Sequence, residues 1–165
     1  MMRKLLPLLT ALALSGCGLH PLYGGGSGST VATTLRSVEV APIEGQVGWL
    51  MHNKLMDRLG PGGGPPIYRL EVELDDNITG FGIRGDRAVT RERRTLRARF
   101  RLVNLSSGGV VLDATAGSDA GIDVVSSEYA TVAAEQTAVE RLSDVVADQI
   151  VARLGLFAAR TADAK

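Results

Sequence analysis

Residues 67–74 read Ile-Tyr-Arg-Leu-Glu-Val-Glu-Leu, and this stretch decides the fold class. Apolar and charged side chains alternate in it, which places Tyr68, Leu70, Val72 and Leu74 on one face of a β-strand. A strand with one apolar face belongs to a sheet that is covered on one side and solvated on the other. The rest of the chain must therefore supply further strands and a layer that covers the apolar face.

The same alternation recurs before and after this stretch and predicts three further strands. Residues 35–43 predict a first strand, and residues 88–103 and 110–116 predict the two arms of a long hairpin joined by a turn at 104–109. The polar, glycine-containing residues 75–86 predict a loop between the second and third strands.

Two segments show helical spacing instead. Apolar residues recur every three or four positions within 46–59, and a longer apolar side runs from Tyr129 to Leu154, with Ser126 or Ser127 as the cap and Gly155 as the stop. We expect Trp49 and Tyr129 to pack in the core or at its edge. The simplest arrangement is an α+β, two-layer sandwich: a four-stranded, mostly antiparallel sheet with two helices packed on one face.

The N-terminus predicts an export signal. Arg3 and Lys4 precede about ten apolar residues, which is too short a stretch for a lasting membrane span. We therefore divide the chain into a signal peptide (1–16), a lipidated cysteine with a flexible tether (17–34), one α/β domain (35–157) and a disordered tail (158–165).

The residues Leu14-Ser15-Gly16-Cys17 resemble a bacterial lipobox. This resemblance implies an S-diacylglycerol group and an N-acyl chain on Cys17, which together hold a protein stably at a membrane. Gly18, in place of the aspartate that retains lipoproteins at the inner membrane, implies the periplasmic side of the outer membrane. The alternative is an ordinary signal peptide followed by a chance cysteine.

The composition argues against several function classes. The chain of 165 residues has 18 Lys and Arg against 18 Asp and Glu, so nucleic-acid binding is not favoured. One cysteine and two histidines provide neither a disulfide framework nor a typical zinc site, and we find no catalytic set. We therefore expect a protein that is not an enzyme, with no metal and no cofactor apart from the lipid on Cys17.

The charge is distributed unevenly. Between Arg84 and Arg101, eight arginines stand against Asp86 and Glu92. A period of two places five of them on one strand face, together with Thr95: Arg91, Arg93, Arg97, Arg99 and Arg101.

This arginine face has two interpretations. It is either a solvated surface with weak cross-strand ion pairs, or a binding strip for phosphate or another anionic partner, which guanidinium groups suit. In the second case the mid-strand residues Arg93, Arg97 and Arg99 are the best candidates.

Several segments, taken in order, resemble the LPS-assembly lipoprotein family of the LptE type. They are Cys17–Gly24, which reads CGLHPLYG, followed by Gly45–Leu59, Tyr68–Leu74, Thr90–Val103 and Glu128–Arg141. The resemblance implies a non-enzymatic outer-membrane lipoprotein in a 1:1 complex with the β-barrel translocon LptD.

In this role the protein would assist assembly of the barrel, plug its lumen and bind lipopolysaccharide for insertion into the outer leaflet. The polar lumen of such a barrel suits a plug with a charged sheet face. The alternative function is that of an accessory lipoprotein of a phospholipid-transport ABC system.

Overall fold

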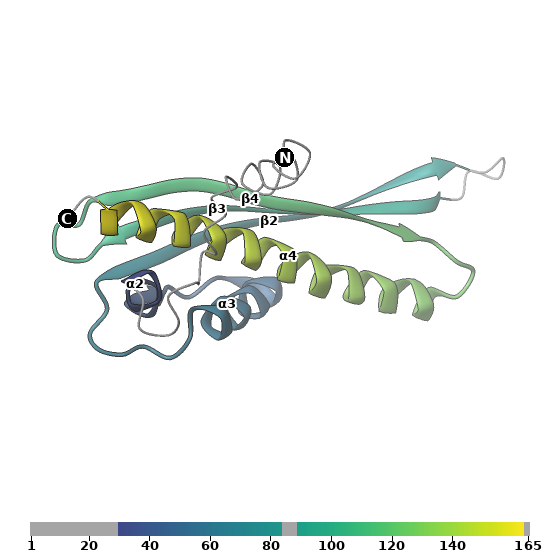
Figure 1. The fold of residues 1–165 in the computed structure, drawn as a ribbon. Helices are drawn as coiled ribbons and strands as arrows, with labels where there is room; N and C mark the ends of the chain where they lie inside the picture. The colour runs from purple at the N-terminus through teal and green to yellow at the C-terminus, as the bar shows by residue number, and fades with distance from the viewer. Residues whose placement is uncertain (1–29, 84–88, 164–165) are drawn as a thin grey trace, which may run out of the picture.

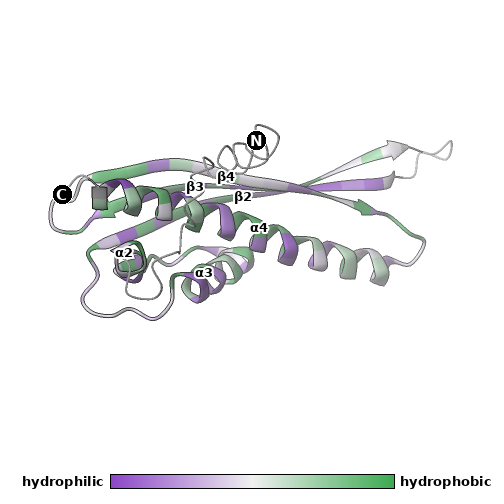
Figure 2. Cartoon of the chain, in the orientation of Figure 1, coloured by the Kyte–Doolittle hydropathy of each residue, from purple (hydrophilic) through white to green (hydrophobic). Residues whose placement is uncertain are grey.

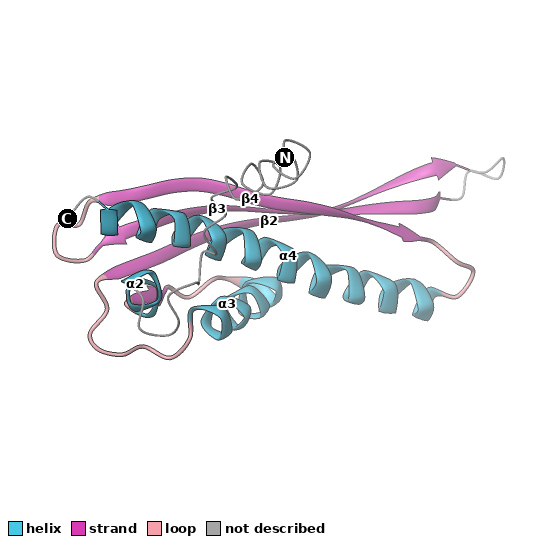
Figure 3. Cartoon of the chain, viewed as in Figure 1, coloured by secondary structure: helices cyan, strands magenta, loops and turns pink. Residues whose placement is uncertain are grey.

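The computed structural model describes residues 30–83 and 89–163 of the chain. It contains a four-stranded sheet in the order β1-β2-β3-β4, with the helices on one side of it (Figures 1 and 3). The elements in chain order are α2 (Thr30–Arg36), β1 (Val38–Val40), α3 (Gly45–Leu59), β2 (Tyr68–Ile83), β3 (Val89–Asn104), β4 (Val110–Asp123) and α4 (Glu128–Asp163).

The α+β class and the four-stranded, mostly antiparallel sheet are confirmed. β2, β3 and β4 are antiparallel neighbours, whereas β1 runs parallel to β2, so the sheet is mixed. The described part of the chain has three helices in the covering layer, where the sequence predicted two, because a short helix precedes β1.

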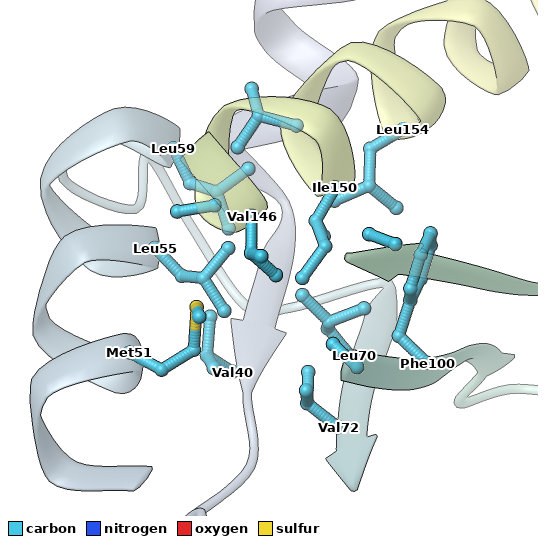
Figure 4. Close-up of a cluster of buried hydrophobic side chains, with 14 of the residues drawn as sticks. Val40, Met51, Leu55, Leu59, Leu70, Val72, Phe100, Val146, Ile150 and Leu154 are labelled. Atoms are coloured by element: carbon cyan, nitrogen blue, oxygen red, sulfur yellow. The ribbon is translucent and has the colours of Figure 1, made fainter. Parts of the chain in front are cut away.

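The core lies between the sheet and the helices (Figure 4). Leu70 from β2 and Phe100 from β3 meet Met51 from α3 and Ile150 from α4, and all four side chains are fully buried. Alternate residues of β3 point into this core, as the period of two predicts. Helical spacing supplies the facing residues Leu55, Leu59, Val146 and Leu154.

The prediction of a loop over residues 75–86 was wrong for residues 75–83, which belong to β2. β2 continues to Ile83, and its polar half pairs with β3 from Asp75 opposite Arg97 to Ile83 opposite Val89. The polarity that suggested a loop is compensated by charges on the neighbouring strand, because Arg94 binds Asp76 across the pair. The result is a long three-stranded ribbon that extends beyond the core (Figure 1).

The prediction that α4 stops at Gly155 was also wrong. The helix continues to Asp163, so residues 158–163 are helical and do not belong to a disordered tail. Glycine inside a helix costs about 1 kcal/mol relative to alanine. Packing offsets this cost, because Leu154 and Ala158 are buried and Phe157 stacks edge-on against Tyr68.

The first strand and the tether also differ from expectation. Strand β1 spans only residues 38–40 of the predicted 35–43, and α2 begins at Thr30, inside the predicted tether. The predicted signal peptide, Cys17 and the rest of the tether lie outside the described residues, as do Arg84 and Arg87. Trp49 and Tyr129 do not pack in the core, since they are 67% and 86% exposed.

Candidate binding face of the sheet

The five predicted arginines lie together on the face of the sheet that points away from the helices, here called the outer face. Leu96, Ala98, Phe100 and Leu102 of β3 are buried, so the intervening residues point outward. Figure 2 shows a hydrophilic stretch at the beginning of β3, where this row starts. The sequence therefore located the face, and the structure adds what surrounds it.

Carboxylates from β4 pair with three of the arginines. The distances between nitrogen and oxygen are 2.9 Å for Arg91 to Asp123, 3.2 Å for Arg97 to Asp119 and 2.9 Å for Arg99 to Asp113. These ion pairs follow the register of the two strands. Asp123 lies directly opposite Arg91, whereas Asp119 and Asp113 are diagonal neighbours of their arginines. The row of like charges is thus interleaved with opposite charges, which removes the repulsion expected along a bare arginine row.

The pairing of Arg99 with Asp113 shifts the pKa of both groups. The side-chain hydrogen bond from Arg99 lowers the pKa of Asp113, and the same bond raises the pKa of Arg99. Both groups therefore stay charged over a wider pH range than in isolation.

On the opposite side, β2 neutralises the last arginine. Arg101 lies 3.4 Å from Glu71 and 3.5 Å from Glu73. Four of the five predicted arginines therefore already have a carboxylate partner, and the outer face is a mixed-charge surface. An anion that binds Arg97 or Arg99 must compete with an aspartate.

Arg93 is the exception among the five arginines of this face, because in the described part of the chain it has no ion pair. Its guanidinium carbon lies 5.5 Å from the centroid of the Phe81 ring, a cation–π arrangement. Its cross-strand neighbours are Thr79 on β2 and Gly121 on β4, both uncharged. A Cβ atom added at Gly121 would meet nothing within 4 Å, so there is open space beside Arg93.

A shallow depression of about 460 Å³ lies farther along the outer face. One of its lining residues, Arg97, lies over Gly117 of β4: a Cβ atom at Gly117 would be 2.5 Å from Cδ of Arg97, so the missing side chain lets Arg97 lie flat across the strand. Both signs of charge line the depression: Glu73, Leu74, Asp75, Arg97, Ala98, Arg99 and Thr115. It suits a zwitterionic or sugar-phosphate group better than a simple anion.

Arg94 belongs to the opposite face of the ribbon and has a different role. Its guanidinium binds both carboxylate oxygens of Asp76, at 2.9 and 2.5 Å, and donates to the backbone oxygen of Glu135 in α4 at 3.0 Å. The bond to Asp76 raises the pKa of Arg94. Sequence reasoning counted Arg94 only as part of the basic segment, although its even position already placed it on the helix side.

Neither a membrane-spanning helix nor a metal-ligand cluster occurs in residues 30–83 and 89–163. None of the helices in these ranges combines the length and the apolar character that crossing a bilayer requires. Within the same ranges, no three His, Cys, Asp or Glu side chains gather as metal ligands would.

Comparisons with known proteins agree with this fold. The family model described as "LptE: Lipopolysaccharide-assembly" matches residues 35–154. A comparison with curated proteins gives no match.

Solved structures similar to the chain include the following three. A lipoprotein from Caulobacter crescentus is 28% identical, with a TM-score of 0.63, and the match covers 78% of this chain and 96% of the other. Rare lipoprotein B from Shewanella oneidensis is 8% identical, with a TM-score of 0.59 and coverages of 75% and 96%. A minor lipoprotein from Acinetobacter baumannii is 13% identical, with a TM-score of 0.58 and coverages of 73% and 92%. The last two show similarity of fold alone.

Proposed function

This chain belongs to the LptE family of lipopolysaccharide-assembly proteins, and we propose on that premise that it binds lipopolysaccharide and serves as the plug and assembly partner of an LptD-type β-barrel. The observation that carries the proposal is the family match over residues 35–154, which includes the complete sheet and most of α4. LptE proteins are accessory lipoproteins without enzymatic activity, and we assign this chain the same kind of role in a 1:1 complex.

Acylation of Cys17 supplies the membrane attachment in this proposal. A diacylglycerol thioether and an N-acyl chain, at about 0.8 kcal/mol for each buried CH₂ group, hold a protein at a bilayer without a spanning segment. Residues 18–29 then connect the lipid to α2, at the start of the described chain. Because Gly18 and not aspartate follows the cysteine, we propose the periplasmic side of the outer membrane as the location.

The mixed charge of the outer face supports a plug. The lumen of an outer-membrane barrel is polar and lined with charges, so a surface of paired arginines and carboxylates can exchange partners with it at low cost. A uniformly positive strip would be a poorer plug, because it would need matching acidic residues at every position.

For lipopolysaccharide, we place the first contact at Arg93. A lipid A phosphate can approach this guanidinium without displacing a carboxylate, and Phe81 lies beside it as an apolar neighbour. Arg97 and Arg99, which the sequence suggested equally, would have to release Asp119 and Asp113 first. Arg93 should therefore contribute more to binding than either of them.

The test is lipopolysaccharide binding by the purified mature chain, its Arg93→Gln variant and an Arg91→Gln control. A hydrogen bond between charged groups contributes about 1.5–3 kcal/mol, so we expect Arg93→Gln to weaken binding roughly ten- to hundredfold. Arg91→Gln removes the same charge from the same face but from a residue paired with Asp123, and should change affinity by less than about threefold. Equal effects of the two variants, or none from Arg93→Gln, would contradict the assignment.

A further inference from the structure

The edge of β2 beyond Leu70 has no neighbouring strand in the described part of the chain. β1 pairs with β2 only from Tyr68 to Leu70, and the last bond of this edge runs from the Ala41 N–H to the Leu70 oxygen at 2.9 Å. Pro42 follows, and its nitrogen has no hydrogen to donate, so the chain leaves the sheet and enters α3 at Gly45.

A regular row of backbone groups is left on this edge. The N–H of Tyr68 and the oxygen of Leu70 point toward β1, so the even residues farther along direct their N–H and C=O groups to the same side. The odd residues bond to β3. The row that remains consists of Val72, Leu74, Asp76, Ile78 and Gly80.

The opposite edge of the sheet, formed by β4, has a hydrogen-bond partner from a helix. There the side-chain amide of Gln149 in α4 accepts from the Gly117 N–H at 3.1 Å and donates to the Gly117 oxygen at 3.3 Å. β4 thus has a helix residue bonded to its outer backbone. The sequence of β2 contains neither proline nor lysine, two residues that often protect an edge strand from pairing.

The side chains along the open edge define what fits it. On the outer face β2 presents Glu71, Glu73 and Asp75, and among the described residues Asp75 has neither a hydrogen bond nor an ion pair. On the helix side it presents Leu74, which is half-buried, and Ile78, which is exposed. A strand that is basic on one face and apolar on the other would match both, as β3 already does from the other side.

We propose that the edge of β2 from Val72 to Gly80 binds an extended segment of a partner protein, which adds as a further strand with basic residues on the outer face. A second copy of this chain fits less well, because pairing two β2 edges would bring the acidic residues of both copies together. The site lies at the sheet edge and is separate from the lipopolysaccharide contact at Arg93.

The test uses a synthetic peptide in which arginine and valine alternate over the length of Val72–Gly80, and a second peptide with glutamate in place of arginine. Both are titrated into the mature chain, and amide hydrogen exchange is followed by NMR. We expect saturable binding of the arginine peptide alone, with slower exchange at the even residues of the row. The odd residues, whose N–H groups already bond to β3, should change little.

Two variants with matched charge changes complete the experiment. Asp75→Asn should weaken binding of the arginine peptide about two- to fivefold, the effect of one exposed ion pair. Asp119→Asn makes the same change near the β4 edge and should have no effect.

A third variant, Ile78→Pro, tests the backbone contact. It removes one outward N–H without touching a β3 bond and should abolish binding. If that variant unfolds, the comparison of Asp75→Asn with Asp119→Asn still decides.

Equal binding of both peptides, protection outside the row, or equal effects of Asp75→Asn and Asp119→Asn would overturn the proposal. So would a concentration-dependent dimer that protects the same amides, since the occupant would then be a second copy.

Discussion

Replacing Arg94 with methionine should loosen the contact between α4 and the ribbon formed by β2 and β3. Methionine keeps most of the length of the side chain but removes both bonds to Asp76 and the bond to the Glu135 oxygen. Asp76 would then keep its charge without a partner, on a side chain that is only 21% exposed.

The magnitude follows from the burial of the pair. Breaking a fully buried ion pair costs about 3–5 kcal/mol, whereas an exposed pair contributes about 0.2–1 kcal/mol. The Arg94 side chain is 12% exposed and lies between these limits, so we expect a loss of about 2 kcal/mol in the free energy of unfolding. In a domain of this size that corresponds to roughly 5–10 °C in melting temperature.

Urea unfolding measures the loss, and an unchanged slope would show that the variant keeps its compactness. Hydrogen exchange locates the change: amides of α4 around Glu135 should exchange faster, while those around Ile150 in the core should not. The control is Arg93→Gln, on the other face of the same strand, which should stay within about 0.5 kcal/mol of the parent.

The reasoning is refuted if Arg94→Met destabilises no more than Arg93→Gln. It is also refuted if the faster exchange spreads evenly over α4, because the bonds of Arg94 to Asp76 and Glu135 would then have no local effect on the helix.

Three further outcomes test the fold and its electrostatics. Phe100→Ala should lower the free energy of unfolding by about 3–5 kcal/mol, because Phe100 is fully buried at the centre of the core; a loss below about 1 kcal/mol in urea unfolding would contradict this packing. Gly48→Ala should cost about 1–3 kcal/mol, since the added Cβ would lie 2.6 Å from the Ile43 backbone oxygen, whereas Gly63→Ala meets no atom and serves as the control. The hydrogen bond from Lys54, with a second from Arg58, lowers the pKa of Asp144; its contribution to stability is therefore present above the ordinary pKa of 3.8 and lost as the pH falls through the lowered value. Unfolding measured from neutral to acidic pH should show Asp144→Asn less stable at neutral pH and converging with the parent in acid, and a constant difference would show that the Asp144 charge is not responsible.

The sequence predicted best where a pattern had one explanation. Alternation in 67–74 and 88–103 predicted strands, and the same period placed Arg91, Arg93 and Arg97 on one face because strand geometry allows nothing else. The helix over 46–59 was within one residue of the observed α3.

The failures come from tertiary contacts that a local pattern does not contain. Asp75 and Asp76 are typical loop residues in sequence, and only the pairing of β2 with the arginine-rich β3 explains why they form a strand. Gly155 is a typical helix stop in sequence, and only the packing of Phe157 and Ala158 explains why the helix continues. The pairing of the outer-face arginines depends on the register of β4, which sets Asp113, Asp119 and Asp123 beside them. Sequence reasoning found the arginines, but only the register distinguishes Arg93 from the others.

The proposed complex with an outer-membrane barrel is tested by identifying the protein that co-purifies with this chain. The full chain, tagged at its C-terminus, is extracted from bacterial membranes with detergent, and the bound material is identified by mass spectrometry. We expect one large outer-membrane β-barrel in a 1:1 ratio, recovered with a chain that carries acyl groups on Cys17. Recovery of an inner-membrane phospholipid transporter, or of an unacylated chain without a barrel, would contradict it.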